Sequence, residues 1–307
     1  MLGRIVKGVK EFFYVYIEEE NEYKDKIISC NSRGVFRKDS LRLKPLAGDF
    51  VDIDINHEHR YSTEMFGIIR KISDRKNSLK RPPVANLDVL FIVTSVKSPM
   101  PSYYFIDKLT VTAVENNITP VIIINKIDLA ENADEIYDIY SKAGFKTLKV
   151  SALKPESTGF DEIKNEMRGK TCVFAGVSGA GKSSILNKLF GDLNLNTGSL
   201  SDKIERGKHT TRTVEFFKNN LGGYAADTPG FSALDFEENE YIIKENLVFA
   251  FPDLEKYMSK CKYTKCTHIK EEGCGITEAL SNGEISKSRH ESYVTLFDIL
   301  KNRRVYK

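Results

Sequence analysis

The sequence predicts an α/β protein in which a central domain of alternating strands and helices is flanked by two smaller domains. Apolar runs at Val89–Thr94, Val121–Ile124 and Cys172–Ala175 alternate with helical patterns, as expected for parallel strands that are buried on both faces. Short strand-forming runs precede this region, and a cysteine cluster with helical periodicity follows it. We expect the three domains to span residues 1–75, 76–233 and 234–307.

The N-terminal domain is predicted to be a small β-barrel. Strand formers gather at Glu11–Ile17, Ile27–Cys30 and Val51–Ile55, and the last of these runs alternates with period two. Several short strands in so small a domain favour an OB-fold barrel. Its basic side chains fit nucleic-acid contact as well as they fit a solvated loop; they are Arg33, Arg37, Lys38, Arg42 and Lys44.

A basic stretch at residues 70–83 is predicted to form a mobile linker after the barrel. It holds six basic residues and one acid, and it ends at Pro82-Pro83. Such a linker can contact a phosphate backbone, or its charges can simply be solvated.

Composition excludes several classes of protein. No apolar run reaches the roughly 18 residues of a membrane span, and the N-terminus lacks the apolar core of an export signal. An odd, clustered set of five cysteines argues for a reducing compartment and a metal site instead of disulfides. We therefore expect a cytoplasmic protein without membrane contact; its net charge of +3 only weakly favours a polyanionic partner.

Residues 176–183 match the phosphate-loop pattern G-x-x-x-x-G-K-[ST], between a predicted strand and a predicted helix over 184–190. Glycines let backbone N–H groups turn toward phosphate oxygens, and the positive end of the following helix adds to the attraction. Lys182 is expected to reach the β- and γ-phosphates, and Ser183 to bind Mg²⁺. The expected phosphate-binding set is Gly176, Ser178, Gly179, Ala180, Gly181, Lys182, Ser183 and Ser184.

The tetrapeptide N-K-I-D that begins at Asn125 follows an apolar strand and is expected to select the base. The Asp128 carboxylate can accept two hydrogen bonds from guanine N–H groups that adenine does not offer. A wrong base would leave this charge unpaired, so GTP and GDP are preferred to ATP. Asn125 is expected to brace the loops and contact the base, and the Lys126 stem to cover its face. The backbone of Ser151-Ala152 is expected to contact the guanine oxygen.

The order of these motifs indicates a circular permutation. A conventional GTPase begins with its phosphate loop, whereas here the base-reading motif precedes that loop. A switch-I-like G-K-H-T-T follows at residues 207–211, and a switch-II-like D-T-P-G at residues 227–230 comes last. Switch II therefore leads directly into the C-terminal domain, and nucleotide state can be transmitted along the chain.

The two switch segments supply the remaining groups around Mg²⁺ and the γ-phosphate. Asp227 is expected to act on the water ligands of Mg²⁺, and the Gly230 N–H to meet the γ-phosphate. Either Thr210 or Thr211 can complete the Mg²⁺ shell when GTP is bound, and Thr211 is favoured.

Phe231 occupies the position at which many GTPases carry a glutamine that orients the attacking water. A phenyl ring cannot orient water, so intrinsic hydrolysis is expected to be slow unless another group acts. His209, beside the metal-binding threonines, is the candidate catalytic residue; the alternative is a solvent-facing loop histidine.

Three cysteines and a histidine lie within 14 residues near the C-terminus. Four such ligands in a short segment suit tetrahedral Zn²⁺, and the lack of an evident open position indicates one structural ion. Unrelated buried thiols are the alternative. The proposed zinc ligands are Cys261, Cys266, His268 and Cys274. Helices predicted over 277–280 and 284–302 make this domain mostly helical, and the apolar face of the second is expected to lie in the core.

The permuted order, the G-K-H-T-T segment, the N-terminal barrel and the C-x4-C-x-H-x5-C cluster together resemble the bacterial small-subunit-dependent GTPase A (RsgA, or YjeQ) family over the whole chain. The resemblance implies an Mg²⁺-dependent hydrolysis of GTP to GDP that the 30S ribosomal subunit stimulates. It also implies a role late in small-subunit maturation and contact with 16S rRNA. The family's switch I histidine and zinc ligands fall on His209 and on the cluster named above. We expect a monomer.

Two positions differ from familiar patterns. Lys208 stands where many relatives carry arginine, and the charge is kept. Gly179 stands where other GTPase families place an asparagine that holds potassium, so potassium activation by that route is not expected.

The rival functions are a permuted GTPase of the large subunit, an RNA-binding scaffold with a structural GTP site, and an ATP-dependent enzyme.

Overall fold

The computed structural model describes residues 1–32, 44–56, 66–129, 133–154, 159–191, 214–227 and 242–303. The chain divides into two compact units, and one of the divisions along the chain falls within strand β11 (Thr171–Ala175). One unit contains the N-terminal strands together with the hairpin near residue 220. The other contains the strands and helices after Asp88 and the C-terminal helices. The three-domain boundaries expected from the sequence stay a prediction.

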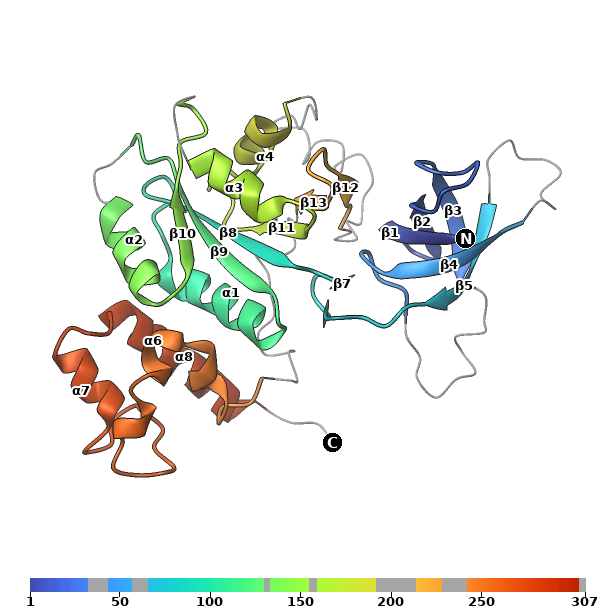
Figure 1. The fold of residues 1–307 in the computed structure, drawn as a ribbon. Helices are drawn as coiled ribbons and strands as arrows, with labels where there is room; N and C mark the ends of the chain where they lie inside the picture. Colours follow the sequence, from blue (N-terminus) through green and yellow to red (C-terminus); the bar gives the residue numbers. More distant parts are fainter. Residues whose placement is uncertain are drawn as a thin grey trace. The chain divides into compact units, whose positions relative to one another are not determined.

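The N-terminal strands form a closed five-stranded barrel in the order β1-β2-β3-β5-β4 (Figure 1), which confirms the expected barrel. Its strands are β1 (Leu2–Val9), β2 (Phe12–Ile17), β3 (Ile27–Ser32), β4 (Phe50–Asn56) and β5 (Phe66–Ile72). Strand β3 pairs with β5 in parallel, and the other pairs are antiparallel. Buried side chains such as Ile5, Val15 and Ile53 fill the barrel.

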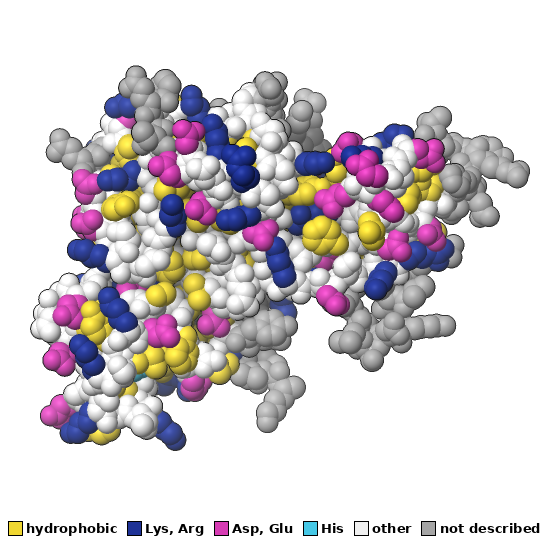
Figure 2. All heavy atoms as spheres, in the orientation of Figure 1, with side chains coloured by type: hydrophobic (Ala, Val, Ile, Leu, Met, Phe, Trp, Pro, Cys, Tyr) yellow, Lys and Arg dark blue, Asp and Glu magenta, His cyan; other side chains and the backbone are white. Residues whose placement is uncertain are grey.

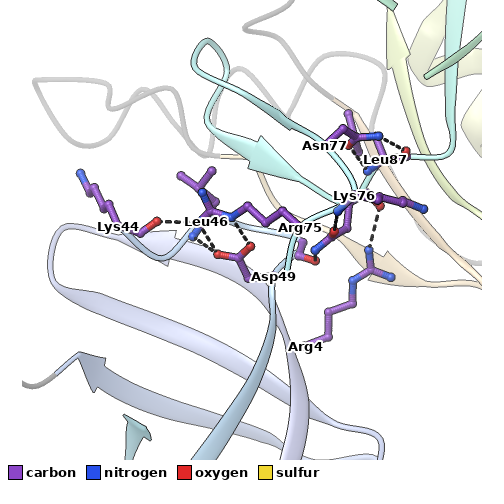
Figure 3. A network of polar contacts seen from close by, with 10 residues as sticks. Arg4, Lys44, Leu46, Asp49, Arg75, Lys76, Asn77 and Leu87 are labelled. Atoms are coloured by element: carbon purple, nitrogen blue, oxygen red, sulfur yellow. Dashed lines mark hydrogen bonds and ion pairs between the residues drawn. The ribbon is translucent and has the colours of Figure 1, made fainter. Parts of the chain in front are cut away.

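The basic stretch after the barrel is not the free linker that the sequence suggested. Its first residues, Arg70 and Lys71, belong to β5, while β6 (Ser78–Leu79) and β7 (Val84–Ala85) pair as a small sheet. Arg75 donates from two nitrogens to the buried Asp49 carboxylate at 2.7 Å each (Figure 3). Arg75 is therefore engaged within the protein, because folding pairs its charge with a carboxylate that the sequence pattern did not reveal.

The second sheet has the strand order β10-β9-β8-β11-β13-β12. Its strands are β8 (Val89–Ser95), β9 (Thr119–Asn125), β10 (Lys146–Lys149), β11, β12 (Phe217–Lys218) and β13 (Tyr224–Asp227). Strand β9 pairs in parallel with β8 and β10, whereas β12 and β13 form an antiparallel hairpin. All residues of β8 and β11 are buried, as their continuous apolar runs predicted.

Helices follow these strands in the expected alternation. They are α1 (Tyr103–Glu115), α2 (Ala133–Lys142), α3 (Gly159–Met167) and α4 (Lys182–Phe190). Helix α1 packs on β8 and β9, and α2 packs on β9 and β10 (Figure 1). This layered α/β arrangement places the loops that follow β9 and β11 at the carboxyl ends of buried strands.

The C-terminal region is mostly helical, as predicted. Its elements are η3 (Leu247–Ala250), α6 (Pro252–Glu255), η4 (Met258–Lys260), α7 (Gly275–Ser281) and α8 (Lys287–Asn302). Helix α8 packs against α1 (Figure 1). The apolar face expected for α8 lies in a buried core that includes Ile285, Tyr293, Leu296, Phe297 and Leu300.

Within the described ranges, no helix combines the length and the apolar character needed to cross a bilayer. On the face drawn in Figure 2, lysine and arginine side chains are interspersed with aspartate and glutamate. This mixture agrees with the small net charge of +3. A polyanionic partner would therefore depend on a local concentration of positive charge.

Candidate nucleotide-binding and metal sites

Asn125 joins three of the sequence motifs. It is the last residue of β9, and its side chain is buried. Its Nδ2 donates to the carbonyl oxygen of Ala180 in the phosphate loop at 2.9 Å. Its Oδ1 accepts from the backbone N–H of Ala152 at 3.3 Å. One amide thus fixes the base-reading motif against both the phosphate loop and the Ser151-Ala152 segment.

The phosphate loop needs glycine at position 181 because Asn125 passes so close. Gly181 has a φ of +97°, and a Cβ built on it would stand 2.1 Å from Asn125 Nδ2. Any side chain here would displace the amide that links the motifs. The loop residues Ser178 and Gly179 are exposed, so this part of the loop is accessible to a ligand.

Helix α4 begins at Lys182, immediately after the loop, as the phosphate-loop pattern predicts. Lys182 Nζ donates to the carbonyl oxygens of Gly176 and Val177 at 2.8 and 3.2 Å. The ammonium therefore lies across the loop that a phosphate chain would enter. Ser183 and Ser184 occupy the first turn of α4.

Asp128 is fixed by the neighbouring motif. The Ser151 hydroxyl donates to its carboxylate, and this hydrogen bond lowers the pKa of Asp128. The group is therefore an anion at neutral pH, as a guanine-reading carboxylate requires. Lys126 has a φ of +62°, and its ammonium donates to the carbonyl oxygen of Ser98.

Several predicted residues are outside the part of the chain that the structure describes. They are Lys208, His209, Thr210, Thr211, Gly230, Phe231 and the barrel-loop residues Arg33, Arg37, Lys38 and Arg42. Asp227 is placed by its backbone, at the end of β13. Lys44 is described, and its carbonyl accepts from Arg75 at 2.6 Å.

The predicted metal ligands do converge. The four ligand atoms of Cys261, Cys266, His268 and Cys274 all lie within 4.8 Å of one another. His268 Nδ1 lies 3.5 Å from Cys261 Sγ and 3.7 Å from Cys274 Sγ, and these two sulfurs are 4.0 Å apart. Tetrahedral ligands at about 2.0–2.3 Å from one metal are separated by about 3.5–3.8 Å. The geometry therefore fits a single tetrahedral metal ion with three sulfur ligands and one nitrogen ligand.

The protonation of His268 also suits metal binding. Burial lowers the pKa of this imidazole, which keeps it in the neutral form that binds metals. Its backbone has a φ of +63°, and its carbonyl contacts His290 Nε2 at 2.8 Å. Tyr293 also donates its hydroxyl to the carbonyl of Thr267 at 3.0 Å. Helix α8 thereby holds the ligand loop in shape.

Glu271 organises the same loop, and sequence reasoning missed it. Its carboxylate accepts from the backbone N–H groups of Thr267, Ile269 and Lys270 at 2.7, 3.0 and 3.1 Å. Partial burial opposes ionisation, but the hydrogen bonds from Thr267 and the backbone prevail and lower the pKa of Glu271 to about 2. A glutamate three residues from two metal ligands could have suggested this role from sequence.

Replacing Glu271 with glutamine is expected to destabilise the ligand loop by about 1–3 kcal/mol, since one carbonyl oxygen cannot replace two charged acceptors. The stabilisation from Glu271 is present above its unfolded pKa, near 4.5, and is lost as the pH falls toward 2. Hydrogen exchange of residues 261–274 between pH 7 and pH 3 measures both effects. The exposed neighbour Glu272, changed to glutamine, is the control; equal protection in both variants would contradict the assignment.

Arg289 is a second residue that the sequence did not reveal. It is fully buried on α8 and donates to Asp253 through Nε and Nη2 at 3.1 and 2.8 Å. Its Nη1 donates to Asp107 of α1 at 2.5 Å, and its guanidinium lies 4.5 Å from the ring centre of Phe251. The triad ties the C-terminal helices to α1. Its position four residues before Tyr293, on the apolar face of α8, was the available signal.

An α/β sheet in which the base-reading motif precedes the phosphate loop defines the protein as a circularly permuted GTPase, an enzyme that hydrolyses GTP. The chain matches the family models described as RsgA GTPase, over residues 72–237, and RsgA N-terminal domain, over residues 2–60. The chain belongs to the RsgA GTPase family.

Named relatives and solved structures are similar to this chain over nearly its whole length. The small ribosomal subunit biogenesis GTPase RsgA of Caldanaerobacter subterraneus subsp. tengcongensis is 40% identical over 98% of this chain and 96% of its own. That of Bacillus subtilis is 37% identical over 98% of both chains. The crystal structure of YjeQ from Thermotoga maritima has a TM-score of 0.77 at 34% identity, covering 99% of both chains. The crystal structure of YloQ, a circularly permuted GTPase, has a TM-score of 0.74 at 32% identity, covering 100% of this chain and 96% of that one.

Proposed function

We propose that this GTPase binds the 30S ribosomal subunit through 16S rRNA and couples GTP hydrolysis to a late step of small-subunit maturation and to its own release. The observation that carries the proposal is full-length similarity to GTPases named for small-subunit biogenesis, in a chain whose Asn125 joins the base-reading and phosphate loops. The protein would act in the cytoplasm as a monomer.

The proposed nucleotide contacts follow from the described loops. Asp128 reads the guanine N–H groups, Asn125 braces the loops, and the stem of Lys126 covers the base, while the Ser151-Ala152 backbone meets the guanine oxygen. Lys182 would exchange its carbonyl partners for the β- and γ-phosphates, and the backbone of residues 176–184 would surround the phosphates. The placement of Asn125 between Ala152 and Ala180 supports this assignment.

Two metals complete the proposal. Mg²⁺, when bound, would neutralise charge on the β- and γ-phosphates. Ser183 and Thr211 are the proposed ligands, Asp227 would act on the water ligands of the ion, and the Gly230 N–H would meet the γ-phosphate. The three thiolates and the neutral imidazole of the C-terminal cluster fit Zn²⁺ by donor type and by spacing. Four side chains would fill all four ligand positions of that ion, so the zinc would be structural.

A concentration of positive charge beside the metal cluster supports contact with RNA. Residues 256–270 contain five lysines and no acidic residue, and all five lysines are exposed. Lys262 Nζ lies 5.5 Å from the ring centre of Tyr263, which is half exposed. Ammonium groups can contact phosphates while a tyrosine stacks on an unpaired base. We therefore place part of the rRNA contact on the metal-binding loop.

Hydrolysis and release would be linked by differential affinity. The GTP form would bind the subunit more tightly than the GDP form, because ordered switches set the pose of the RNA-binding domains. His209 would align the attacking water in place of the glutamine that Phe231 replaces. Lower affinity after hydrolysis would then release the protein.

The test is GTP turnover by the purified protein alone, with 30S subunits and with 50S subunits. Stimulation by 30S subunits alone is expected. Equal stimulation by 50S subunits, or none despite GTP binding, would overturn the ribosomal assignment.

His209→Ala is expected to keep GTP affinity within about twofold and to lower stimulated turnover at least about a hundredfold. Unchanged turnover would remove His209 from catalysis.

Changing Asp128 to asparagine is expected to weaken GTP binding by about 100- to 1,000-fold, because two charge-assisted hydrogen bonds are lost. The asparagine amide can instead donate to the carbonyl that xanthine carries at the corresponding position, so XTP should gain affinity. Fluorescent-nucleotide titration with GTP and XTP measures the change in affinity for each nucleotide. A variant that loses both nucleotides equally would indicate damage to the loop and not altered base reading.

A further inference from the structure

Arg4 of the barrel is enclosed by three aromatic rings that come from two parts of the chain. It lies on β1 and is 3% exposed. Its guanidinium carbon is 4.7 Å from the ring centre of Phe50, on β4. The other two rings, Tyr224 at 4.5 Å and Phe216 at 5.9 Å, belong to the segment that forms the β12–β13 hairpin. A cation shielded from water by ring faces is attracted to each of them.

Arg4 has no carboxylate paired with it among the described residues. Its Nη2 donates to the carbonyl of Asn86 at 3.4 Å, and its Nε has no hydrogen-bond partner in the described ranges. Asn86 in turn donates to the carbonyl of Gly48 at 3.1 Å and accepts from the N–H of Lys76 at 3.0 Å. Arg4 thus joins the barrel to the chain that leaves it and to the hairpin.

Further contacts attach both ends of the hairpin segment to the barrel. The N–H of Phe216 donates to the carbonyl of Val6 at 2.8 Å, and the Tyr224 hydroxyl donates to Glu18 at 2.6 Å. Lys218 pairs with Asp25 at 3.2 Å. The hairpin and the barrel therefore form one packed body, with Arg4 at the buried centre of the contact.

The hairpin ends at a residue with a proposed role in the reaction. Strand β13 runs from Tyr224 to Asp227, so the ring that covers Arg4 is three residues before that carboxylate. We propose that Arg4 is a positioning residue for GTP hydrolysis: by fixing β13 to the barrel, it sets the backbone position of Asp227, the residue proposed to support Mg²⁺. The proposal rests on the role assigned to Asp227 above. By linkage, a partner that shifts the barrel against the hairpin would change the affinity for Mg²⁺-GTP.

The test compares wild type, Arg4→Met and Arg4→Lys in the full-length protein. The MgCl₂ concentration that half-saturates binding of a fluorescent non-hydrolysable GTP analogue is measured for each, together with GDP affinity in EDTA. Arg4→Met keeps the volume but removes the cation, and it should raise the half-saturating MgCl₂ concentration by at least about fivefold. GDP affinity in EDTA should stay within about twofold, since Arg4 contacts neither base nor phosphate loop. Arg4→Lys should restore most of the loss.

Arg70→Met is the matched control, because Arg70 is a half-exposed barrel arginine paired with Asp54. It should leave Mg²⁺ dependence unchanged. An Arg4→Met protein that folds with wild-type Mg²⁺ dependence would overturn the proposal, even if its melting temperature fell. The assay contains no ribosomes, so failure of 30S stimulation and failure of the Mg²⁺ shift are separate results.

A milder pair of variants gives an independent test that does not depend on how Arg4→Met folds. Tyr224→Phe keeps the ring over Arg4 and removes only the hydrogen bond to Glu18, while Lys218→Met removes the exposed pair with Asp25. The double variant should raise the half-saturating MgCl₂ concentration by about two- to threefold. No shift in this folded double variant would likewise contradict the positioning role.

Discussion

Arg289→Met is expected to destabilise the protein by about 3–5 kcal/mol, because removing one member of a buried ionic triad leaves the others charged and unpaired. Asp107 and Asp253 would keep two carboxylates in the contact between α1 and the C-terminal helices. Methionine fills much of the space of the arginine side chain, but it carries no positive charge to pair with the two carboxylates. Urea unfolding followed by far-UV circular dichroism measures the loss, since the chain contains no tryptophan.

Two further variants test whether the buried charge of Arg289 causes the loss of stability. Lys287→Met changes an 85% exposed side chain on the same helix, and it should cost less than about 0.5 kcal/mol. Arg289→Lys keeps the charge but loses the fork that meets both carboxylates, so its loss should be intermediate. A loss below about 1 kcal/mol for Arg289→Met would show that the triad contributes little to stability.

Cys266→Ala is expected to abolish the binding of one equivalent of zinc and to unfold the ligand loop. In zinc-finger peptides the ion contributes about 10–16 kcal/mol of apparent binding free energy, and three remaining ligands hold it far less tightly. Unfolding should stay within the C-terminal helical region and reach the apolar core under the loop, because Cys274 lies in the same core as Tyr293 and Leu296 of α8 and Cys266 packs against it. Metal analysis and hydrogen exchange measure the two effects, and GDP binding should persist.

The buried barrel cysteine provides the control for this experiment. Cys30→Ala removes a buried thiol from a different core, so it should cost stability without changing zinc stoichiometry. Retained zinc in Cys266→Ala would contradict the ligand assignment. Loss of zinc without loss of exchange protection would show that the loop is held by Glu271 and α8 alone.

The sequence by itself determined the features that depend on neighbouring residues. Four metal ligands within 14 residues can meet around one ion whatever the rest of the chain does. A phosphate loop between a strand and a helix carries its own backbone geometry, and continuous apolar runs predicted the buried strands β8, β9 and β11. The permuted order is likewise a property of the linear chain.

Strands β1 and β5 escaped prediction for a physical reason. In β1, Gly3 and Arg4 are buried beside Ile5 and Val6, so the strand lacks the expected alternation. In β5, the basic residues Arg70 and Lys71 led to the prediction of a linker. Both strands gain their order from the partners that close the barrel, and a barrel closes only through pairings between distant strands.

Tertiary structure alone decided how charges are used inside the protein. Arg289 meets Asp107 across 182 residues, Asn125 meets Ala180 across 55, and Arg4 is enclosed by the β12–β13 segment. Hydrophobic periodicity assigns a lone arginine to the surface, because burying an unpaired cation is costly. Only the fold brings a compensating carboxylate or aromatic ring to it, and such partners leave no local pattern in the sequence.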